Sequence, residues 1–243
     1  MVRALRRAHL VAGAVLAFAA PHPFPHFGAG CVRADYRSAG VVVRAERCGP
    51  PRGAAVVVLH GCGGFGTFDH TLAADLPGFG IATLDVDYFA PTPPPGKHGF
   101  CNVWTRPAEL FSRWEQVTAA AARALRRDGY AHVGAVGWSL GAGVALATAE
   151  DEHVFDSVAA FSAIAHPPTL DHAAALPPSI FLDGGPRDIV PPANARALYA
   201  AARRAGVRAA LFVYPDGTHE WAGRQGAIGR ARAAAFLRRQ FGT

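Results

Sequence analysis

The length, composition and charge of the chain limit what it can be. Of its 243 residues, 51% are hydrophobic and 17% are charged, so the chain can bury a sizeable core and is not a disordered protein. The formal net charge is +6, yet the arginines are dispersed and Lys97 is the one lysine. This pattern lacks the basic stripe of a nucleic-acid-binding protein, and no nucleic-acid partner is expected. We expect one folded domain.

The N-terminal segment has the composition of an export signal. Residues 1–20 begin with three arginines, continue as an apolar run over 10–20 and carry an Ala-Phe-Ala triplet at 17–19. They predict a signal peptide and export to the periplasm or out of the cell. A run of about eleven apolar residues is too short for a stable membrane span. If the start is misassigned, the protein is cytoplasmic. Residues 21–35 include a Pro-rich stretch and predict an irregular leader, with the folded domain over 36–243.

Four cysteines form an even set early in the chain: Cys31, Cys48, Cys62 and Cys101. In an exported protein such a set permits two disulfides, although four cysteines allow three pairings and the sequence does not choose among them. We favour Cys31 with Cys48 and Cys62 with Cys101. Four reduced, partly buried thiols are the alternative.

The first half of the chain predicts an edge strand followed by a βαβ unit. Residues 41–46 suggest an edge strand in a hairpin with the residues just before it. The continuous apolar run at 54–59 predicts a central parallel strand, and a helix at 68–76 leads to a second buried strand at 81–84. The long Pro-rich loop over 90–105 follows the carboxyl end of that strand, where α/β sheets place their sites.

The second half continues the alternation of strands and helices. A helix with one apolar face carries Leu110, Trp114, Val117, Ala121 and Leu125 at steps of three and four. Further strands are expected at 133–136, 158–161, 179–182 and 209–214, a helix at 193–205, and a final helix that ends at Phe241. The pattern predicts an α/β fold, a doubly wound, mostly parallel sheet with helices on both faces.

Residues 137–141 read Gly-Trp-Ser-Leu-Gly, between the strand expected at 133–136 and a run of small residues that suits a helix. In this G-x-S-x-G elbow, a tight strand-to-helix turn strains the backbone of the central residue and exposes its side chain. The turn also crowds any Cβ on the two flanking glycines. Ser139 is therefore the candidate nucleophile, and an ordinary glycine-containing turn is the alternative.

A serine hydroxyl needs a base to take its proton, and the base needs an acid to hold it. In the fold that carries this elbow the three residues occur in the chain order Ser, acid, His. His219 follows the last expected strand and is the candidate base. Asp188 follows the strand before it and is the candidate acid, with Asp183 as second choice. Asp85 and Asp87 are interpreted as the polar end of a buried strand.

The oxyanion formed during acyl transfer needs fixed hydrogen-bond donors. The backbone N–H of Leu140, directly after the nucleophile, is one candidate donor. The second is the backbone N–H of Cys62 in the His-Gly-Cys-Gly-Gly loop that follows the strand at 54–59, a loop that His60 helps to shape. A buried or disulfide-bonded thiol is the simpler explanation of Cys62, and both roles are compatible.

Together these motifs resemble the dienelactone hydrolase family of the α/β-hydrolase fold. The resemblance runs from about residue 41 to the C-terminus and rests on HGCGG, the Asp-Tyr-Phe strand end, the Pro-rich loop with its later cysteine, GWSLG, GGPRDIVPP and VYPDGTHEW. Founding members use a cysteine nucleophile and an acidic residue in the first loop. This chain has Ser139 and no acidic residue in HGCGG, so it resembles the serine branch. The resemblance carries over Ser139, Asp188 and His219.

The function implied is a serine hydrolase that cleaves carboxylic esters or lactones through an acyl-enzyme. An acyltransferase on the same triad and a polyester or cutinase-like hydrolase are the alternatives, and a catalytically silent binding protein is a third class. No motif supports a metal, a nucleotide or another cofactor. The partner expected is a small-molecule ester or lactone, with Trp138 and the loop over 90–105 shaping the acyl pocket. Arg106 and Arg187 are read as surface arginines rather than as ligands for a substrate carboxylate.

Overall fold

The computed structural model describes residues 30–92, 99–101, 108–165 and 167–243. The predicted signal peptide and residues 21–29 of the predicted leader lie outside the described residues. Arg106 and parts of the loop expected over 90–105 do so as well.

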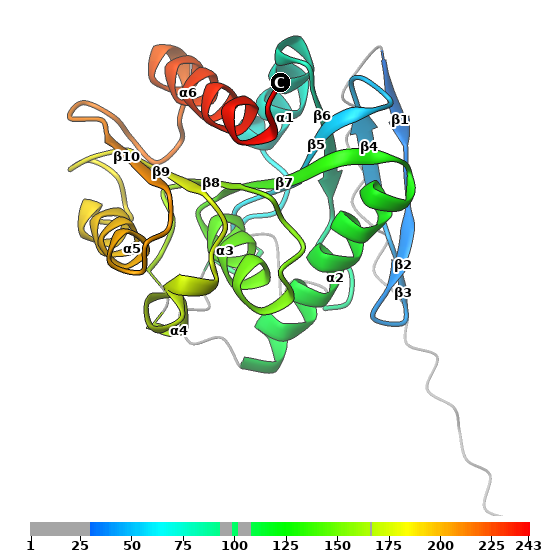
Figure 1. The fold of residues 1–243 in the computed structure, drawn as a ribbon, viewed down its shortest axis with the longest axis horizontal. Helices are drawn as coiled ribbons and strands as arrows, with labels where there is room; N and C mark the ends of the chain where they lie inside the picture. Colours follow the sequence, from blue (N-terminus) through cyan, green and yellow to red (C-terminus); the bar gives the residue numbers. More distant parts are fainter. Residues whose placement is uncertain (1–29, 93–98, 102–107, 166) are drawn as a thin grey trace, which may run out of the picture.

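Ten strands are described: β1 (Cys31–Arg33), β2 (Tyr36–Ser38), β3 (Val41–Val43), β4 (Ala45–Cys48), β5 (Gly53–Leu59), β6 (Ile81–Val86), β7 (Tyr130–Trp138), β8 (Val158–Phe161), β9 (Ser179–Asp183) and β10 (Ala209–Val213). Eight of them form one sheet in the order β1-β4-β6-β5-β7-β8-β9-β10 (Figure 1). The strands from β6 to β10 in that order are parallel, whereas β1 and β4 are antiparallel to their neighbours. The remaining two, β2 and β3, form a separate antiparallel pair.

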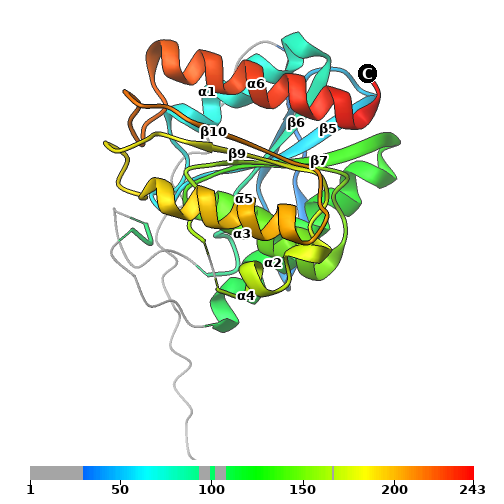
Figure 2. The same ribbon diagram turned by 60° about the vertical axis from the view of Figure 1, so that its left-hand side comes forward.

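Helices cover both faces of this sheet. They are α1 (Thr67–Asp75), α2 (Ala108–Arg127), α3 (Leu140–Glu152), α4 (Pro167–Asp171), α5 (Pro192–Arg204) and α6 (Gly223–Phe241), with short 3₁₀ turns η1 (Leu76–Phe79) and η2 (Ala173–Ala175). Figure 2 shows α1 and α6 on one face of the sheet and α2, α3 and α5 on the other. The expected doubly wound, mostly parallel fold is confirmed, because each βα connection returns the chain to a strand parallel to the last.

Two apolar layers hold the helices against the sheet. The layer beneath α2, α3 and α5 contains Trp114 and Leu125, both shielded from solvent. These residues lie on the apolar face expected for α2, which is confirmed. The layer beneath α1 and α6 contains Phe68 and Leu237. Every residue of β5 after Gly53 is buried, as a central strand with helices on both faces requires.

The strand expected over 41–46 is divided in two. It breaks at Arg44, after which β4 enters the main sheet while β3 pairs with β2. The Arg44 carbonyl accepts a hydrogen bond from the N–H of Asp87 at 3.0 Å, and the Arg44 side chain forms an ion pair with the Asp87 carboxylate at 2.7 Å. Asp87 therefore fixes the point where the chain changes partner, a long-range contact that local alternation does not reveal.

Strand β1 lies inside the range expected to be an irregular leader. It pairs with β4 in a register that places Cys31 opposite Cys48, and these two cysteines form a disulfide. The expectation of an irregular chain over 31–33 is thus wrong. The reason is that a three-residue strand has almost no sequence pattern of its own and is held by its partner strand and by the covalent link.

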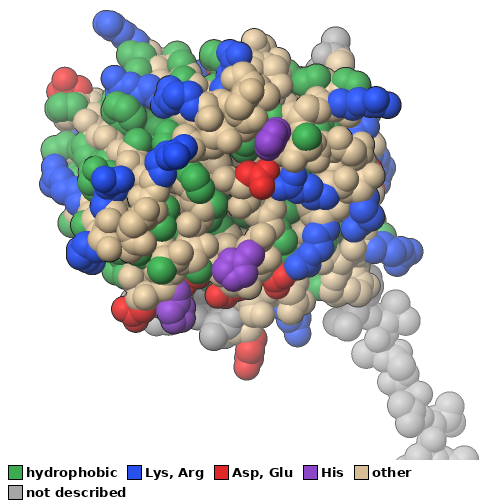
Figure 3. Space-filling view, viewed as in Figure 1, with side chains coloured by type: hydrophobic (Ala, Val, Ile, Leu, Met, Phe, Trp, Pro, Cys, Tyr) green, Lys and Arg blue, Asp and Glu red, His purple; other side chains and the backbone are tan. Residues whose placement is uncertain are grey.

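Figure 3 shows how the basic residues lie on one face of the molecule. On the face drawn in Figure 3 the Lys and Arg side chains are scattered among apolar and neutral ones instead of forming a stripe. Among the helices of the described ranges, none is both long and apolar enough to cross a bilayer.

Two carboxyl groups are buried on the α1 side of the sheet. Asp69 of α1 and Asp85 of β6 are both shielded from solvent. Asp69 accepts a hydrogen bond from the N–H of Gly66 at 2.8 Å, but neither carboxyl oxygen of Asp85 has a hydrogen-bond partner in the described part of the chain. Burial raises the pKa of Asp69 to about 7. Burial and the nearby Asp69 raise the pKa of Asp85 well above its ordinary value.

These two groups should make the fold less stable at higher pH. The folded chain holds their protons more tightly than the unfolded chain, so their contribution is complete below about pH 4 and is lost as the pH rises. For Asp69 the loss runs up to its folded pKa of about 7 and is on the order of 4 kcal/mol at the upper end. Urea denaturation at pH 4.5 and pH 8 measures this fall, which Asp69→Asn should reduce.

The exposed Asp171 provides the matched control for this measurement. Asp171→Asn removes one carboxyl group from the surface and should keep the full wild-type fall in stability. If Asp69→Asn falls as steeply as Asp171→Asn between the two pH values, the buried carboxyl group is not the cause.

Candidate active site

Ser139 occupies the turn between β7 and α3. Its backbone has φ 55° and ψ −116°, a conformation that L residues seldom adopt and that the surrounding structure must enforce. The turn directs the chain from the carboxyl end of the sheet straight into the first turn of α3. The sequence therefore correctly predicts a strand, a strained serine and a helix at this point. The expectation of an exposed serine is wrong, because the residues packed around the turn bury Ser139.

The two glycines of the elbow are required by close backbone contacts. A Cβ on Gly137 would lie 2.3 Å from the carbonyl oxygen of Gly141. A Cβ on Gly141 would lie 2.3 Å from the carbonyl oxygen of Leu59 and 2.4 Å from that of His60. The elbow thus packs directly on the end of β5 at Gly141. A side chain there would push the two segments apart, whereas a side chain at Gly137 would clash with the first turn of α3.

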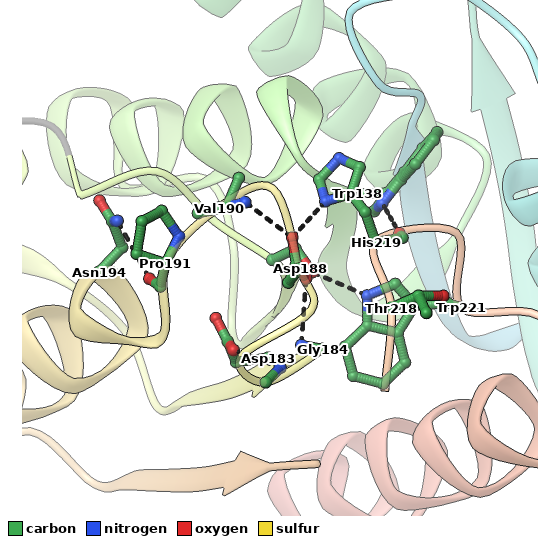
Figure 4. A network of polar contacts seen from close by, with 12 residues as sticks. Trp138, Asp183, Gly184, Asp188, Val190, Pro191, Asn194, Thr218, His219 and Trp221 are labelled. Atoms are coloured by element: carbon green, nitrogen blue, oxygen red, sulfur yellow. Dashed lines mark hydrogen bonds and ion pairs between the residues drawn. The ribbon is translucent and has the colours of Figure 1, made fainter. Parts of the chain in front are cut away.

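The loop after β9 and the loop after β10 bring an acid and a histidine together. His219 Nδ1 lies 2.6 Å from Asp188 Oδ1 (Figure 4), and both side chains are buried. A carboxylate can only accept, so Nδ1 carries the hydrogen of this bond, and in the neutral form of the ring the lone pair lies on Nε2. That is the tautomer a general base needs.

The Asp188 carboxylate is saturated with donors. Besides His219, Oδ1 accepts from the N–H of Val190 at 2.8 Å, and Oδ2 accepts from Ser162 Oγ at 2.5 Å and from the N–H of Gly184 at 3.1 Å. Burial raises the pKa of Asp188, but the hydrogen bonds from His219, Ser162 and Val190 outweigh it and keep the pKa below the ordinary value. Asp188 is therefore a carboxylate at neutral pH.

The other aspartates considered from the sequence take different places. Asp183, at the end of β9, accepts from the N–H of Gly185 at 2.7 Å, and its Oδ2 has no partner within the described chain. Burial raises the pKa of Asp183 to about 6. Asp85 is buried beside α1, and Asp87 is paired with Arg44. The hydrogen bond to His219 comes from Asp188.

Trp138 connects the serine elbow with the histidine loop. Its Nε1–H donates to the carbonyl of His219 at 2.8 Å, and the centroids of the two rings are 5.2 Å apart. The same indole lies against Gly61, where a Cβ would be 2.8 Å from it. Within the described ranges, Asp188 and His219 are in direct contact, whereas Ser139 is linked to them through its neighbour Trp138.

A disulfide and a backbone hydrogen bond hold the loop after β5 against residues 99–101. Cys62 is disulfide-bonded to Cys101, which completes the pairing favoured from the sequence. The carbonyl of Cys62 accepts from the N–H of Phe100 at 2.7 Å, and a Cβ on Gly99 would lie 2.1 Å from that oxygen. Leu140, which carries the other expected donor, is the first residue of α3.

His60 supports the same loop as a neutral ring. Its imidazole is shielded from solvent and stacks on Tyr88 at a centroid distance of 4.3 Å, and the Tyr88 hydroxyl donates to the His60 carbonyl at 2.8 Å. Burial lowers the pKa of His60 to about 4. An uncharged, enclosed ring agrees with the shaping role expected for His60.

Two residues at the site carry contacts that the sequence did not reveal. Ser162, directly after β8, contacts Asp188, and Trp221, two residues after His219, contacts Ser162. The available signal was positional, because residues at the carboxyl ends of parallel strands gather at one edge. Arg187 is exposed and donates to the carbonyl of Asp216, as suits a surface arginine. No group of three or more potential metal ligands occurs in the described residues.

A family model described as the dienelactone hydrolase family matches residues 41–240. The chain belongs to the dienelactone hydrolase family. The match includes every described strand except β1 and β2, and it includes the residues of the elbow and of the loops that carry Asp188 and His219. A search of curated protein sequences found no match.

Solved structures show that this dienelactone hydrolase family member has the α/β-hydrolase fold. The Pyrococcus furiosus esterase Pf2001 aligns with a TM-score of 0.70 at 15% identity, covering 87% of this chain and 93% of the esterase. Est1E from Butyrivibrio proteoclasticus aligns with a TM-score of 0.68 at 15% identity, covering 87% and 99%. A Pyrobaculum calidifontis esterase gives 0.68 at 16% identity, covering 86% and 84%.

Proposed function

We propose that this protein is a serine hydrolase that cleaves carboxylic esters or lactones through an acyl-enzyme intermediate. The observation that carries the proposal is the buried Asp188–His219 pair, with its 2.6 Å hydrogen bond, which Trp138 links to a neighbouring serine held at φ 55°. Structural elements rarely impose such strain without a functional reason. Membership of the dienelactone hydrolase family and the likeness to esterases support a hydrolase.

In the proposed reaction, His219 Nε2 takes the proton of Ser139 as its Oγ attacks the carbonyl carbon. The backbone N–H groups of Leu140 and Cys62 would stabilise the oxyanion. The imidazolium then protonates the leaving alkoxide, which departs and leaves an acyl-serine. Water attacks this ester with His219 again as base, and the proton returns to Ser139 Oγ as the acid is released. Asp188 stays ionised and holds the imidazolium throughout.

The experiment for this proposal combines turnover with covalent labelling. Purified protein should hydrolyse a short p-nitrophenyl ester and a small lactone, and an organophosphonate should add one adduct that peptide mapping places on Ser139. Added alcohol acceptors separate the alternatives, because an acyltransferase would pass most of the acyl group to the acceptor instead of to water. Protein that neither turns over nor reacts with the phosphonate would end the assignment.

We also propose that the protein is exported. Two disulfides, Cys31–Cys48 and Cys62–Cys101, support this proposal, because disulfides persist in oxidising compartments and are rare in the cytosol. Fractionation of the producing cells, with the mass of the mature N-terminus, tests it.

Opening the disulfide next to the proposed oxyanion donor should slow catalysis. The Cys62–Cys101 bond holds the loop after β5 against residues 99–101, and a displaced donor costs roughly a hundredfold or more in kcat. We expect the double variant Cys62→Ser/Cys101→Ser to lose about ten- to a hundredfold in kcat. The loss is limited because the hydrogen bond from Phe100 to the Cys62 carbonyl and the close contact of Gly99 with that carbonyl remain. Initial rates with a p-nitrophenyl ester measure the loss.

The second disulfide supplies the control. Cys31→Ser/Cys48→Ser removes a covalent link of the same kind between β1 and β4, at the opposite edge of the sheet from β10. This variant should lose thermal stability while keeping kcat close to wild type at 25 °C. Equal losses of kcat in the two double variants would show that the effect is general destabilisation.

A further inference from the structure

Ser162 is a buried, strained serine that the proposed reaction does not use. It follows β8 directly, its side chain is shielded from solvent, and its backbone has φ 47°. A non-glycine residue at positive φ is uncommon and is often held there for a function. Its N–H donates to the carbonyl of Leu182 at 2.7 Å, which fixes the residue between β8 and β9.

The hydrogen bonds of Ser162 can run in only one direction. Trp221 Nε1 lies 2.8 Å from Ser162 Oγ, and Ser162 Oγ lies 2.5 Å from Asp188 Oδ2. An indole N–H is only a donor and a carboxylate is only an acceptor, so the hydroxyl must accept from the indole and donate to the carboxylate. Both bonds are buried, where such a chain of hydrogen bonds strengthens each member.

These contacts close a ring around the acid. Trp221 lies two residues after His219 and is itself at φ 51° and buried. The indole packs edge-on against Phe161 and Tyr214 at centroid distances of 4.9 and 5.1 Å. The chain thus runs from His219 to Trp221, and the side chains return through Ser162 and Asp188 to His219. Movement of the histidine loop would have to break one of these bonds.

We propose that Ser162, oriented by Trp221, is a positioning residue. It holds the Asp188 carboxylate in place and limits how strongly the negative charge of Asp188 stabilises the protonated form of His219. The inference rests on the proposed function of Ser139, Asp188 and His219. Ser162 does not touch the substrate in this proposal; it acts through the carboxylate. Its donor hydrogen spreads the negative charge of Asp188, so the carboxylate stabilises the protonated imidazole less than it would with one donor fewer.

The test is the pH dependence of kcat/KM for Ser162→Ala and Ser162→Gly. Both lack the hydroxyl, but only glycine accepts φ 47° without strain. We expect both variants to lose about ten- to a hundredfold in kcat with KM changed less than about threefold, since one hydrogen bond to a charged group is lost. The acid limb, which is the low-pH side of the pH profile of kcat/KM, should shift to higher pH by about half a unit or more in both variants. The reason is that the Asp188 carboxylate then stabilises protonated His219 more strongly.

Ser157→Ala is the matched control. Ser157 is a buried serine just before the same strand, and its hydroxyl donates to the carbonyl of Pro178 at 2.8 Å. This variant loses one buried hydrogen bond and should keep the wild-type acid limb. Acid limbs of both Ser162 variants that coincide with that of Ser157→Ala would overturn the inference.

Trp221→Phe keeps the inference testable if the Ser162 variants do not fold. It retains an aromatic ring against Phe161 but removes the indole N–H, and it should move the acid limb in the same direction by a smaller amount. An unmoved limb would count against the role of Trp221. If Ser139→Ala retained turnover, the proposed function and this inference would fall together, whereas an unmoved limb with Ser139 essential overturns this inference alone.

Discussion

Ser139→Ala is expected to reduce kcat for ester hydrolysis by about a millionfold, to a rate set by the remaining donors and by substrate binding. The side chain at φ 55° is the only group at the elbow that can form the acyl bond, since Trp138 and Leu140 flank it with apolar side chains. Alanine removes the nucleophile and leaves the turn unchanged. The rate of p-nitrophenolate release, with phosphonate labelling of the same preparation, measures the effect.

A near-isosteric variant separates chemistry from folding here. Ser139→Cys keeps the size of the side chain and supplies a thiol, so it should still react with the phosphonate or an alkylating agent while ester turnover falls. Residual activity in Ser139→Ala above about a thousandth of wild type would mean that another residue forms the acyl intermediate, and the assignment of the elbow would be withdrawn.

Asp188→Asn is expected to lower kcat by about ten thousandfold. The amide has no charge to stabilise an imidazolium, and its NH₂ group would face two of the four donors that now surround the carboxylate. His219 would then adopt the tautomer that directs its hydrogen, instead of its lone pair, toward Ser139. Steady-state rates across pH measure the change, because a lost charge also alters the acid limb.

Asp183→Asn is the matched control at the end of the same strand. Asp183 is buried and its pKa is raised by burial to about 6, so a neutral amide changes its charge little in mildly acid solution. We expect a loss of kcat under about tenfold. A larger loss for Asp183→Asn than for Asp188→Asn would make Asp183 the acid and would contradict the hydrogen bond seen to His219.

The sequence predicted the parallel part of the fold because strong local patterns mark it. The apolar runs of β5 and β7, the single apolar face of α2 and the glycines around Ser139 each leave a periodic or steric trace. The N-terminal strands were less predictable. The break at Arg44 depends on Asp87, more than forty residues later, and β1 depends on pairing with β4 and on a disulfide, so neither follows from the residues of the segment alone.

The residues of the candidate site also divide into those that the sequence predicts and those that only the structure reveals. Ser139, Asp188 and His219 were predicted because the elbow and the order of the three residues follow from the fold. Ser162 and Trp221 were not, because their contacts depend on positive φ angles and on how two loops from different strands meet. Asp188 was preferred to Asp183, but the sequence does not show which carboxylate reaches His219, because Asp183 ends β9 and Asp188 follows it by five residues.

The strand that carries the histidine loop has a consequence for thermal inactivation. β10 is the edge strand of the sheet, with β9 as its one neighbour, and each of its residues is only half-buried. Edge elements with little buried surface open before the rest of a fold. Warming should therefore separate His219 from Asp188 while the central strands remain paired, so that the proposed ester hydrolysis disappears first and returns on cooling. The indole contacts of Trp138 and Trp221 set how much heat this early, reversible step requires.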